Sequence, residues 1–248
     1  MFTNMAKIDA VAYSMGSEKY RNERPVRIVN LSSYYIDLAP VTNLRYKRFV
    51  DCHGYEKREY WTDAGWNFIL SKNIAFPLYW HDPSWNHPYQ PVTGVSWWEA
   101  LAFARFDGKT LPTEAQWEYM AGGGVNIYPW GDAEPNPSMA NYAEGCEPRE
   151  LKRRSTEVDR YIQSRSHCGC WDVAGNVSEW CLDNSSKNYD WDNSGRDPVY
   201  LTAEGDAHMV RGGSGLHDDE YLRTTSRDYY SPSLRDNIVG LRCVSNLT

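Results

Sequence analysis

The ten residues from Asp172 to Cys181 read Asp-Val-Ala-Gly-Asn-Val-Ser-Glu-Trp-Cys. Further along the chain stand Arg211-Gly-Gly-Ser214 and Gly240-Leu-Arg-Cys243. Five more short motifs precede Asp172. In chain order they are 15–17 (MGS), 40–43 (PVTN), 91–97 (PVTGVSW), 111–119 (LPTEAQWEY) and 128–131 (YPWG). The order and spacing of these eight segments, more than any one of them, decide the fold.

Three stretches predict helices. Val41 to Asp51 has capping residues at Thr42 or Asn43 and a glycine just past its end. Ser96 to Asp107 opens with the Ser96–Glu99 capping box, in which each side chain bonds the other residue's free backbone N–H. The third helix starts at Pro112–Gln116, where Thr113 and Gln116 have the same spacing, and ends at the glycines 122–124.

Elsewhere short apolar runs alternate with Gly, Pro, Asn and Asp. Val26 to Leu31, Val210 to Gly212 and Val239 to Val244 predict short strands. The stretches 56–90 and 133–166 lack periodicity, and loops that long are often functional. The first of them carries four tryptophans, which favour packing over solvation. With no repeat or linker, the sequence predicts one α+β domain over residues 1–248, with little regular structure and three main helices.

The overall composition argues against several classes of partner. A net charge of −7 without a Lys/Arg-rich run argues against nucleic acid. No run of 18 apolar residues predicts a membrane span, and Met1–Asp9 has no apolar stretch that would fit a signal peptide. The expectation is a cytoplasmic protein. Eleven Trp and eighteen Tyr suit either an irregular core or a recognition surface.

Six cysteines are too sparse to support a domain of this size by disulfides. Cys168-Gly169-Cys170, next to His167, has some features of a metal knuckle. A structural zinc site usually adds a second pair of cysteines, and the sequence has none at the usual spacing. Free thiols are therefore expected.

Taken together, the eight segments closely resemble the formylglycine-generating-enzyme (sulfatase-modifying-factor) superfamily from about Met15 to Val244. The resemblance implies an irregular C-type lectin-like fold, in which little regular structure supports large loops. Members include formylglycine-forming oxidases, carbon–sulfur bond-forming enzymes and the variable proteins of diversity-generating retroelements. The fold alone does not choose among these functions.

The resemblance also locates a copper site that this chain lacks. The oxidases carry two cysteines three and eight residues beyond the serine of Gly-Gly-Ser, where their thiolates bind copper. Here those positions hold His217 and Leu222. We expect no copper and no formylglycine formation. By the same resemblance Cys181 and Cys243 could pair, although a reducing cytoplasm would keep them apart.

Structural calcium is a further implication of the resemblance. The first family site would use the side chains of Asp172 and Glu179 and the carbonyls of Gly175 and Val177, since calcium prefers oxygen ligands. The other interpretation is that Asn176 and Glu179 only hydrogen bond to loop backbone. A second family site would map to Asn141 and Tyr142, with Glu150 as a further carboxylate.

The segment 215–235, after Gly-Gly-Ser, is dense in Asp, Tyr, Ser and His. In retroelement variable proteins, random replacement of template adenines turns asparagine codons into Asp, Tyr, Ser, His, Gly or Leu. All six occur here, whereas Glu220 is harder to reach in this way. Antibody loops favour Tyr, Ser and Gly for similar reasons of contact area and hydrogen bonding. An ordinary family C-terminus is the other interpretation.

Two functions follow. The first is a non-catalytic module that binds a protein or peptide ligand through this segment, with candidate contacts at Gly215, Leu216, His217, Asp218, Asp219, Tyr221, Arg223, Asp228, Tyr229 and Tyr230. The second is an oxidoreductase or biosynthetic tailoring enzyme that uses His217 or Asp218 as an acid–base group. The sequence supplies no redox centre for the second, which leaves the assignment of an enzyme open but disfavoured.

Overall fold

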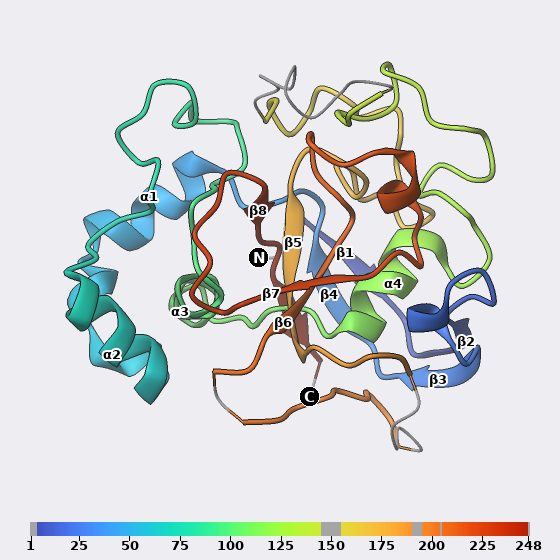
Figure 1. The fold of residues 1–248 in the computed structure, drawn as a ribbon, viewed down its shortest axis with the longest axis horizontal. Helices are drawn as coiled ribbons and strands as arrows, with labels where there is room; N and C mark the ends of the chain where they lie inside the picture. Colours follow the sequence, from blue (N-terminus) through green and yellow to red (C-terminus); the bar gives the residue numbers. More distant parts are fainter. Residues whose placement is uncertain (1–3, 145–154, 190–194, 204, 248) are drawn as a thin grey trace.

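The computed structural model describes residues 4–144, 155–189, 195–203 and 205–247. In that part, helices and strands mix in an α+β arrangement of short elements joined by long loops, as the sequence predicts (Figure 1). The α-helices are α1 (Asn43–Asp51), α2 (Asp63–Lys72), α3 (Trp97–Phe106) and α4 (Glu114–Gly122). The strands are β1 (Met5–Ile8), β2 (Val11–Met15), β3 (Arg27–Leu31), β4 (Tyr34–Asp37), β5 (Ser178–Asn184), β6 (His208–Arg211), β7 (Asp228–Tyr230), β8 (Val239–Gly240) and β9 (Val244–Asn246).

The three predicted helices are confirmed, and their caps form as the sequence indicates. Ser96 Oγ accepts from the Glu99 N–H at 3.2 Å, and the Glu99 carboxylate accepts from the Ser96 N–H at 2.9 Å. Thr113 and Gln116 form the same reciprocal pair at the start of α4. Each pair satisfies two backbone donors that a helix start leaves without a partner.

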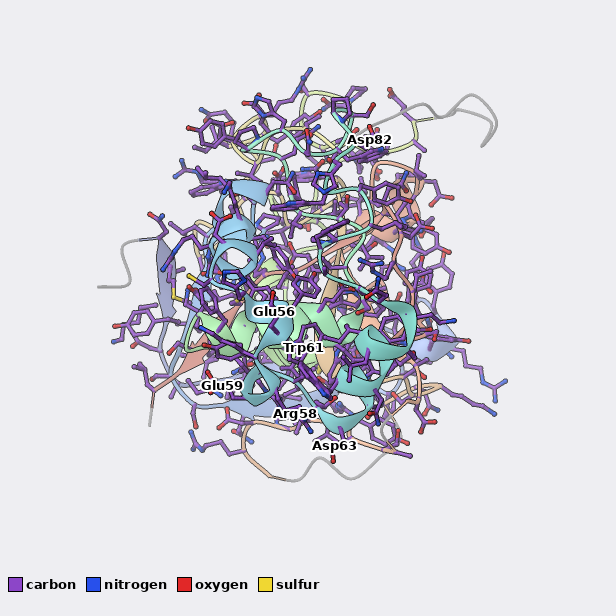
Figure 2. The ribbon with its side chains drawn as sticks, turned by 90° about the vertical axis from the view of Figure 1, so that its left-hand side faces the viewer. Glu56, Arg58, Glu59, Trp61, Asp63 and Asp82 are labelled. Atoms are coloured by element: carbon purple, nitrogen blue, oxygen red, sulfur yellow. The ribbon has the colours of Figure 1, made fainter. Side chains whose placement is uncertain are left out.

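The expectation of only three main helices is wrong, because α2 lies inside the stretch that lacks periodicity. Thr62 caps its start and Asn73 ends it in a left-handed conformation. Of its residues only Gly65 and Ile69 are buried, so the helix shows no regular apolar face in the sequence. Trp61, just before it, is buried and donates to the Gly54 carbonyl at 3.0 Å, which confirms that this region packs (Figure 2).

The strands form three sheets with the orders β1-β4-β9, β2-β3 and β7-β6-β5-β8. The stretch Val239–Val244, predicted as one strand, is two: β8 pairs with β5 in parallel, and β9 pairs with β4 in another sheet. The strand prediction is wrong there, because the chain crosses from one sheet to the other between β8 and β9.

The strand β5 separates two hydrophobic cores. Trp180 faces the core formed with α1 and α3, and the adjacent Cys181 faces the core formed with α4 and the N-terminal strands. On β6, Val210 and Met209 divide in the same way. Successive side chains of a strand point to opposite faces. The sheet β7-β6-β5-β8 is therefore covered on both faces.

Candidate functional site

The motif Asp172–Cys181 forms a tight loop that leads into β5. Gly175 has a φ of +74°, and a Cβ there would meet the Asn141 carbonyl oxygen at 2.3 Å. Only glycine fits such a close approach. Asn176 then donates its backbone N–H to that same carbonyl at 2.8 Å. The loop thereby fixes the neighbouring segment around Asn141.

Glu179 joins three of the motifs in the interior. Its carboxylate accepts two hydrogen bonds of 2.8 Å from the guanidinium of Arg242 and one of 2.7 Å from the indole N–H of Trp117. All three side chains are buried. The positive charge of Arg242 balances the negative charge of Glu179, and these bonds hold the segments 111–119, 172–181 and 240–243 together.

This arrangement bears on the predicted calcium ligands. Both Glu179 oxygens are already bonded to Arg242, and the buried Asp172 carboxylate accepts from the Asn176 amide at 3.2 Å. Burial raises the pKa of Asp172 well above its usual range. Over the described residues no three His, Cys, Asp or Glu side chains converge as metal ligands would. A calcium ion would have to compete with Arg242 for Glu179, and calcium stays a prediction.

The residues predicted for a second calcium site are both buried. The Asn141 carbonyl accepts from Asn176, and Tyr142 packs in a small apolar cluster with Leu222. Glu150, the further carboxylate, lies outside the described residues. The second site stays a prediction as well.

The two positions that hold the oxidase cysteines have different environments. Leu222 is 1% exposed and packs on Tyr128, Ala140, Tyr142 and Ala174. The Nδ1 of His217 lies 2.9 Å from Ser214 Oγ, and its ring stacks on Tyr221 at 4.5 Å between centroids. Burial lowers the pKa of His217 below its usual value of 6.5, against the opposing effect of Asp228 and Asp218. A leucine in an apolar cluster and a neutral imidazole stand where the oxidases have thiolates.

The predicted contact segment forms an exposed surface at two places. The first is the short helix η5 (Asp219–Leu222) with the residues before it, and the second is the edge strand β7. Burial raises the pKa of Tyr221 at the first place, and the charge of Asp228 at the second place raises it further. The two places are therefore neighbours. We call the following residues the recognition surface: His217, Asp218, Asp219, Tyr221, Asp228, Tyr229 and Tyr230.

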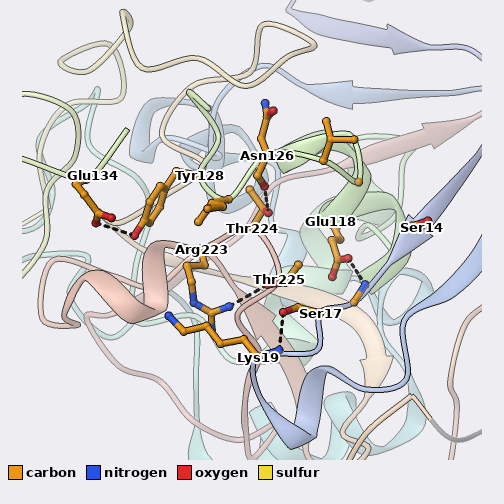
Figure 3. A pocket seen from close by; sticks show the side chains of 14 residues that line it. Ser14, Ser17, Lys19, Glu118, Asn126, Tyr128, Glu134, Arg223, Thr224 and Thr225 are labelled. Carbon is orange, nitrogen blue, oxygen red and sulfur yellow. Dashed lines mark hydrogen bonds between the residues drawn. The ribbon is translucent and has the colours of Figure 1, made fainter. Parts of the chain in front are cut away.

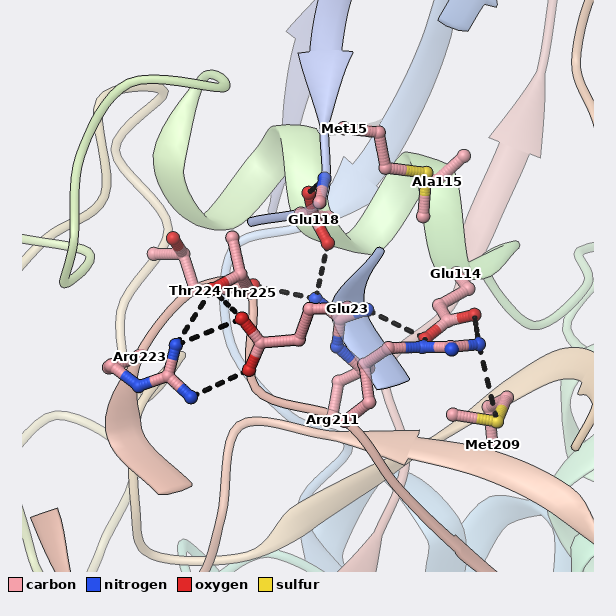
Figure 4. A network of polar contacts seen from close by, with 12 residues as sticks. Met15, Glu23, Glu114, Ala115, Glu118, Met209, Arg211, Arg223, Thr224 and Thr225 are labelled. Carbon is pink, nitrogen blue, oxygen red and sulfur yellow. Dashed lines mark hydrogen bonds and ion pairs between the residues drawn. The ribbon is translucent and has the colours of Figure 1, made fainter. Parts of the chain in front are cut away.

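The middle of the same segment is buried. Arg223 pairs with Glu23 at 2.6 Å (Figure 4). Arg227 pairs with Glu114 at 2.6 Å. Arg211 also binds Glu114, at 2.7 Å. Of the predicted contacts, Gly215 and Arg223 are buried, and Leu216 is half-buried. These pairs anchor the stretch that links the two exposed places.

A pocket of about 450 Å³ lies beyond this anchor (Figure 3). On one side of the pocket lie Arg223, Thr224 and Thr225, and on the other lie the N-terminal segment and the loop after α4. The remaining lining residues include Ser14, Gly16, Ser17, Lys19, Glu118, Asn126, Tyr128 and Glu134. Apart from Arg223, the prediction from the sequence missed the residues of this pocket. The motifs 15–17 and 128–131 mark two of its walls, but nothing local indicates that they meet.

Residues 2–247 match the family described as the sulfatase-modifying factor enzyme 1-like domain. The chain belongs to this family. A formylglycine-generating enzyme of Streptomyces coelicolor is 32% identical over 259 residues, with 90% of this chain and 82% of that enzyme covered. A hercynine oxygenase of Mycolicibacterium thermoresistibile is 31% identical over 245 residues, with 89% of this chain and 52% of the oxygenase covered. The chain thus spans about half of that oxygenase.

Solved structures of this fold include proteins with different names. PvdO of Pseudomonas aeruginosa aligns with a TM-score of 0.74 and 20% identity, over 98% of this chain and 94% of that one. Treponema denticola variable protein 1 aligns with a TM-score of 0.72 and 21% identity, over 98% and 95%. The fold is therefore the C-type lectin-like fold of this family. None of the helices in the described part of the chain has the length and apolar character that a bilayer span requires.

Proposed function

We propose that this family member is a non-catalytic protein that binds a protein or peptide ligand through the recognition surface. The observation that carries the proposal is Leu222. It fills a position where the oxidases of the family need a thiolate, and it is buried among apolar side chains. Without two sulfur ligands, copper chemistry at this place has no support.

The recognition surface has the composition of a contact surface. Tyr229 is 58% exposed and Tyr221 is 36% exposed, each with a large ring and a polar tip. Tyrosines of this kind give contact area at little cost in conformational entropy. The carboxylates of Asp218, Asp219 and Asp228 add negative charge, which favours a ligand with basic groups.

The burial pattern also supports diversification of this segment. Most of the exposed positions carry residue types that adenine replacement yields, with Glu220 as the exception, whereas Arg223 and Arg227 between them are buried in fixed ion pairs. A reverse-transcriptase gene beside the coding region, with a near-copy of its 3′ end that differs at adenines, is the expected genomic context. Flanking DNA without either would contradict diversification and leave ligand binding as a separate question.

Binding is tested with a random peptide display library as the probe. The immobilised chain selects peptides, whose affinities for the Tyr229→Ala and Tyr89→Ala variants are then measured by calorimetry. Tyr89 is a matched control, because it is 55% exposed and lies outside the recognition surface. Loss of a contact worth about 2 kcal/mol weakens binding roughly 30-fold. We expect that loss for Tyr229→Ala alone.

Two outcomes would contradict the proposal. One is a set of selected peptides that bind both variants equally, which would place the contact elsewhere. The other is conversion of a sulfatase-derived cysteine peptide to its aldehyde by the purified chain supplied with copper and oxygen. Such conversion would establish an oxidase and remove the basis of a non-catalytic function.

A tailoring enzyme that uses His217 or Asp218 is the second candidate. The pair Ser214–His217 favours it, since a neutral imidazole next to a hydroxyl is a base beside a nucleophile. Against it, Ser214 is fully buried, and its hydroxyl also accepts from the Leu216 N–H at 3.2 Å. The pair is therefore better suited to shaping the loop than to attacking a substrate.

A further inference from the structure

The loop Ser166–Cys170 carries two thiols that the proposed function does not use. Its ends are joined by two backbone hydrogen bonds of 2.8 Å, from Gly169 to the Ser166 carbonyl and from Ser166 to the Cys170 carbonyl. The turn brings the sulfur atoms of Cys168 and Cys170 to 3.7 Å from each other. Both are free thiols.

We propose that Cys168 and Cys170 form a reversible disulfide, which makes this loop a thiol–disulfide exchange site for small disulfides such as oxidised glutathione. A disulfide needs a sulfur–sulfur distance of about 2.05 Å, so the two atoms have to approach by less than 2 Å. Gly169 lies between them at a φ of +85°, with no atom within 4 Å of a Cβ built on it. The turn therefore has room to adjust.

The two cysteine residues differ in exposure, and the difference assigns their roles. Cys168 is partly exposed, whereas Cys170 is fully buried and lies 3.6 Å from the Asp37 carbonyl. Hydrogen bonding from Cys170, and then from Ser166, lowers the pKa of Cys168 to about 6. Exposed thiols of low pKa are the ones that attack disulfides. Cys168 is the attacking thiol and Cys170 the one that resolves.

The chemistry balances without a metal or a cofactor. The Cys168 thiolate attacks one sulfur of oxidised glutathione, forms a mixed disulfide and releases one glutathione thiolate. Cys170 then gives its proton to the released glutathione thiolate, attacks the Cys168 sulfur and releases the second glutathione as a thiolate. The two cysteines are oxidised by two electrons, one glutathione disulfide is reduced to two thiols, and reduced glutathione or dithiothreitol reverses both steps.

The test uses the full chain in its folded state. After incubation with oxidised glutathione and an acid quench, the chain is unfolded, alkylated with N-ethylmaleimide and cut with trypsin. Cleavage after Arg165 and Lys187 yields one peptide that contains Cys168, Cys170 and Cys181. We expect this peptide to lack two hydrogen atoms and to carry a single alkyl group, on Cys181. Dithiothreitol before alkylation should restore three alkyl groups.

Variants separate the steps. Cys170→Ser should stop the reaction at a stable glutathione adduct on Cys168, and Cys168→Ser should leave Cys170 free of adduct. Cys52→Ser is the control, since it removes an exposed cysteine elsewhere in the chain and should leave the disulfide unchanged. Circular dichroism checks that each variant is folded. If Cys170→Ser does not fold, the mass of the tryptic peptide from the wild-type chain decides whether the disulfide forms.

Two results would overturn the proposal. One is wild-type protein that keeps glutathione on Cys168 without closing the disulfide. The other is a pair that stays fully reduced while Cys52 becomes glutathionylated, because the oxidant would then be active and the pair inert.

Discussion

The buried ion-pair network around Glu114 allows one prediction to be developed in detail. The Glu114 carboxylate accepts from Arg227 at 2.6 and 2.8 Å and from Arg211 at 2.7 Å. The network holds two arginines and the two carboxylates of Glu114 and Glu118, so its charges cancel. Glu114→Gln removes one negative charge and leaves a buried guanidinium without a counter-charge.

Breaking a buried pair in this way costs about 3–5 kcal/mol. That is a large part of the roughly 5–15 kcal/mol by which a folded domain is stable. Urea unfolding, followed by tryptophan fluorescence, measures the change in free energy. The control is Asp51→Asn, which breaks the exposed Lys47–Asp51 pair and should cost less than about 1 kcal/mol. Equal effects of the two substitutions would refute the argument.

The same network predicts how stability depends on pH. Burial alone would raise the pKa of Glu114, but Arg227 and Arg211 outweigh it and lower the pKa from 4.5 to about 2. A carboxylate with a depressed folded-state pKa stabilises the fold fully above its unfolded-state pKa, and this stabilisation is lost as the pH falls toward the folded-state value. The wild type should therefore lose its advantage over Glu114→Gln between about pH 4.5 and about pH 2. A constant difference over that range would contradict the assignment.

Three further predictions concern the loop formed by the motif Asp172–Cys181 and the residues around it. Leu222→Ala should lower the free energy of unfolding by about 2–5 kcal/mol, as a cavity in an apolar cluster does; a loss under about 1 kcal/mol in a urea titration would show that the position is not packed. Gly175→Ala should prevent folding or lower the melting temperature strongly, because its Cβ would meet the Asn141 carbonyl at 2.3 Å, and an unchanged melting curve would contradict that geometry. If calcium binds at the predicted first site, calcium chloride should raise the melting temperature above that in EDTA, and Asp172→Asn should abolish the increase; identical wild-type curves with calcium and with EDTA would argue against the site.

Local signals in the sequence predict local structure well. The capping boxes Ser96–Glu99 and Thr113–Gln116 place two helix starts, because each involves residues only three apart. The helix α2 has no such pair, since Gly65 stands where a Glu or Gln would complete the box. The strands β1, β4 and β7 have only three or four residues each, and β2 and β5 mix polar and apolar residues, so none of the five stands out in the sequence.

The candidate site depends on contacts that no local pattern contains. Arg223 binds Glu23 across 200 residues of chain, and Arg227 binds Glu114 across 113. From the sequence alone, Arg223 is predicted to be an exposed contact residue. The structure shows that Arg223 and Arg227 are structural. Cys181 and Cys243, considered as a pair from the family resemblance, are free thiols in different cores.

The buried anchor between η5 and β7 has a consequence for how this protein can change over generations. Because Leu222, Arg223 and Arg227 secure the stretch from inside, the outward-facing side chains at 218, 219, 221 and 229 contribute little to holding it in place. Substitutions there can alter what the surface touches while folding proceeds as before. A lineage carrying this scaffold could therefore sample new partners one residue at a time, without first acquiring extra stability.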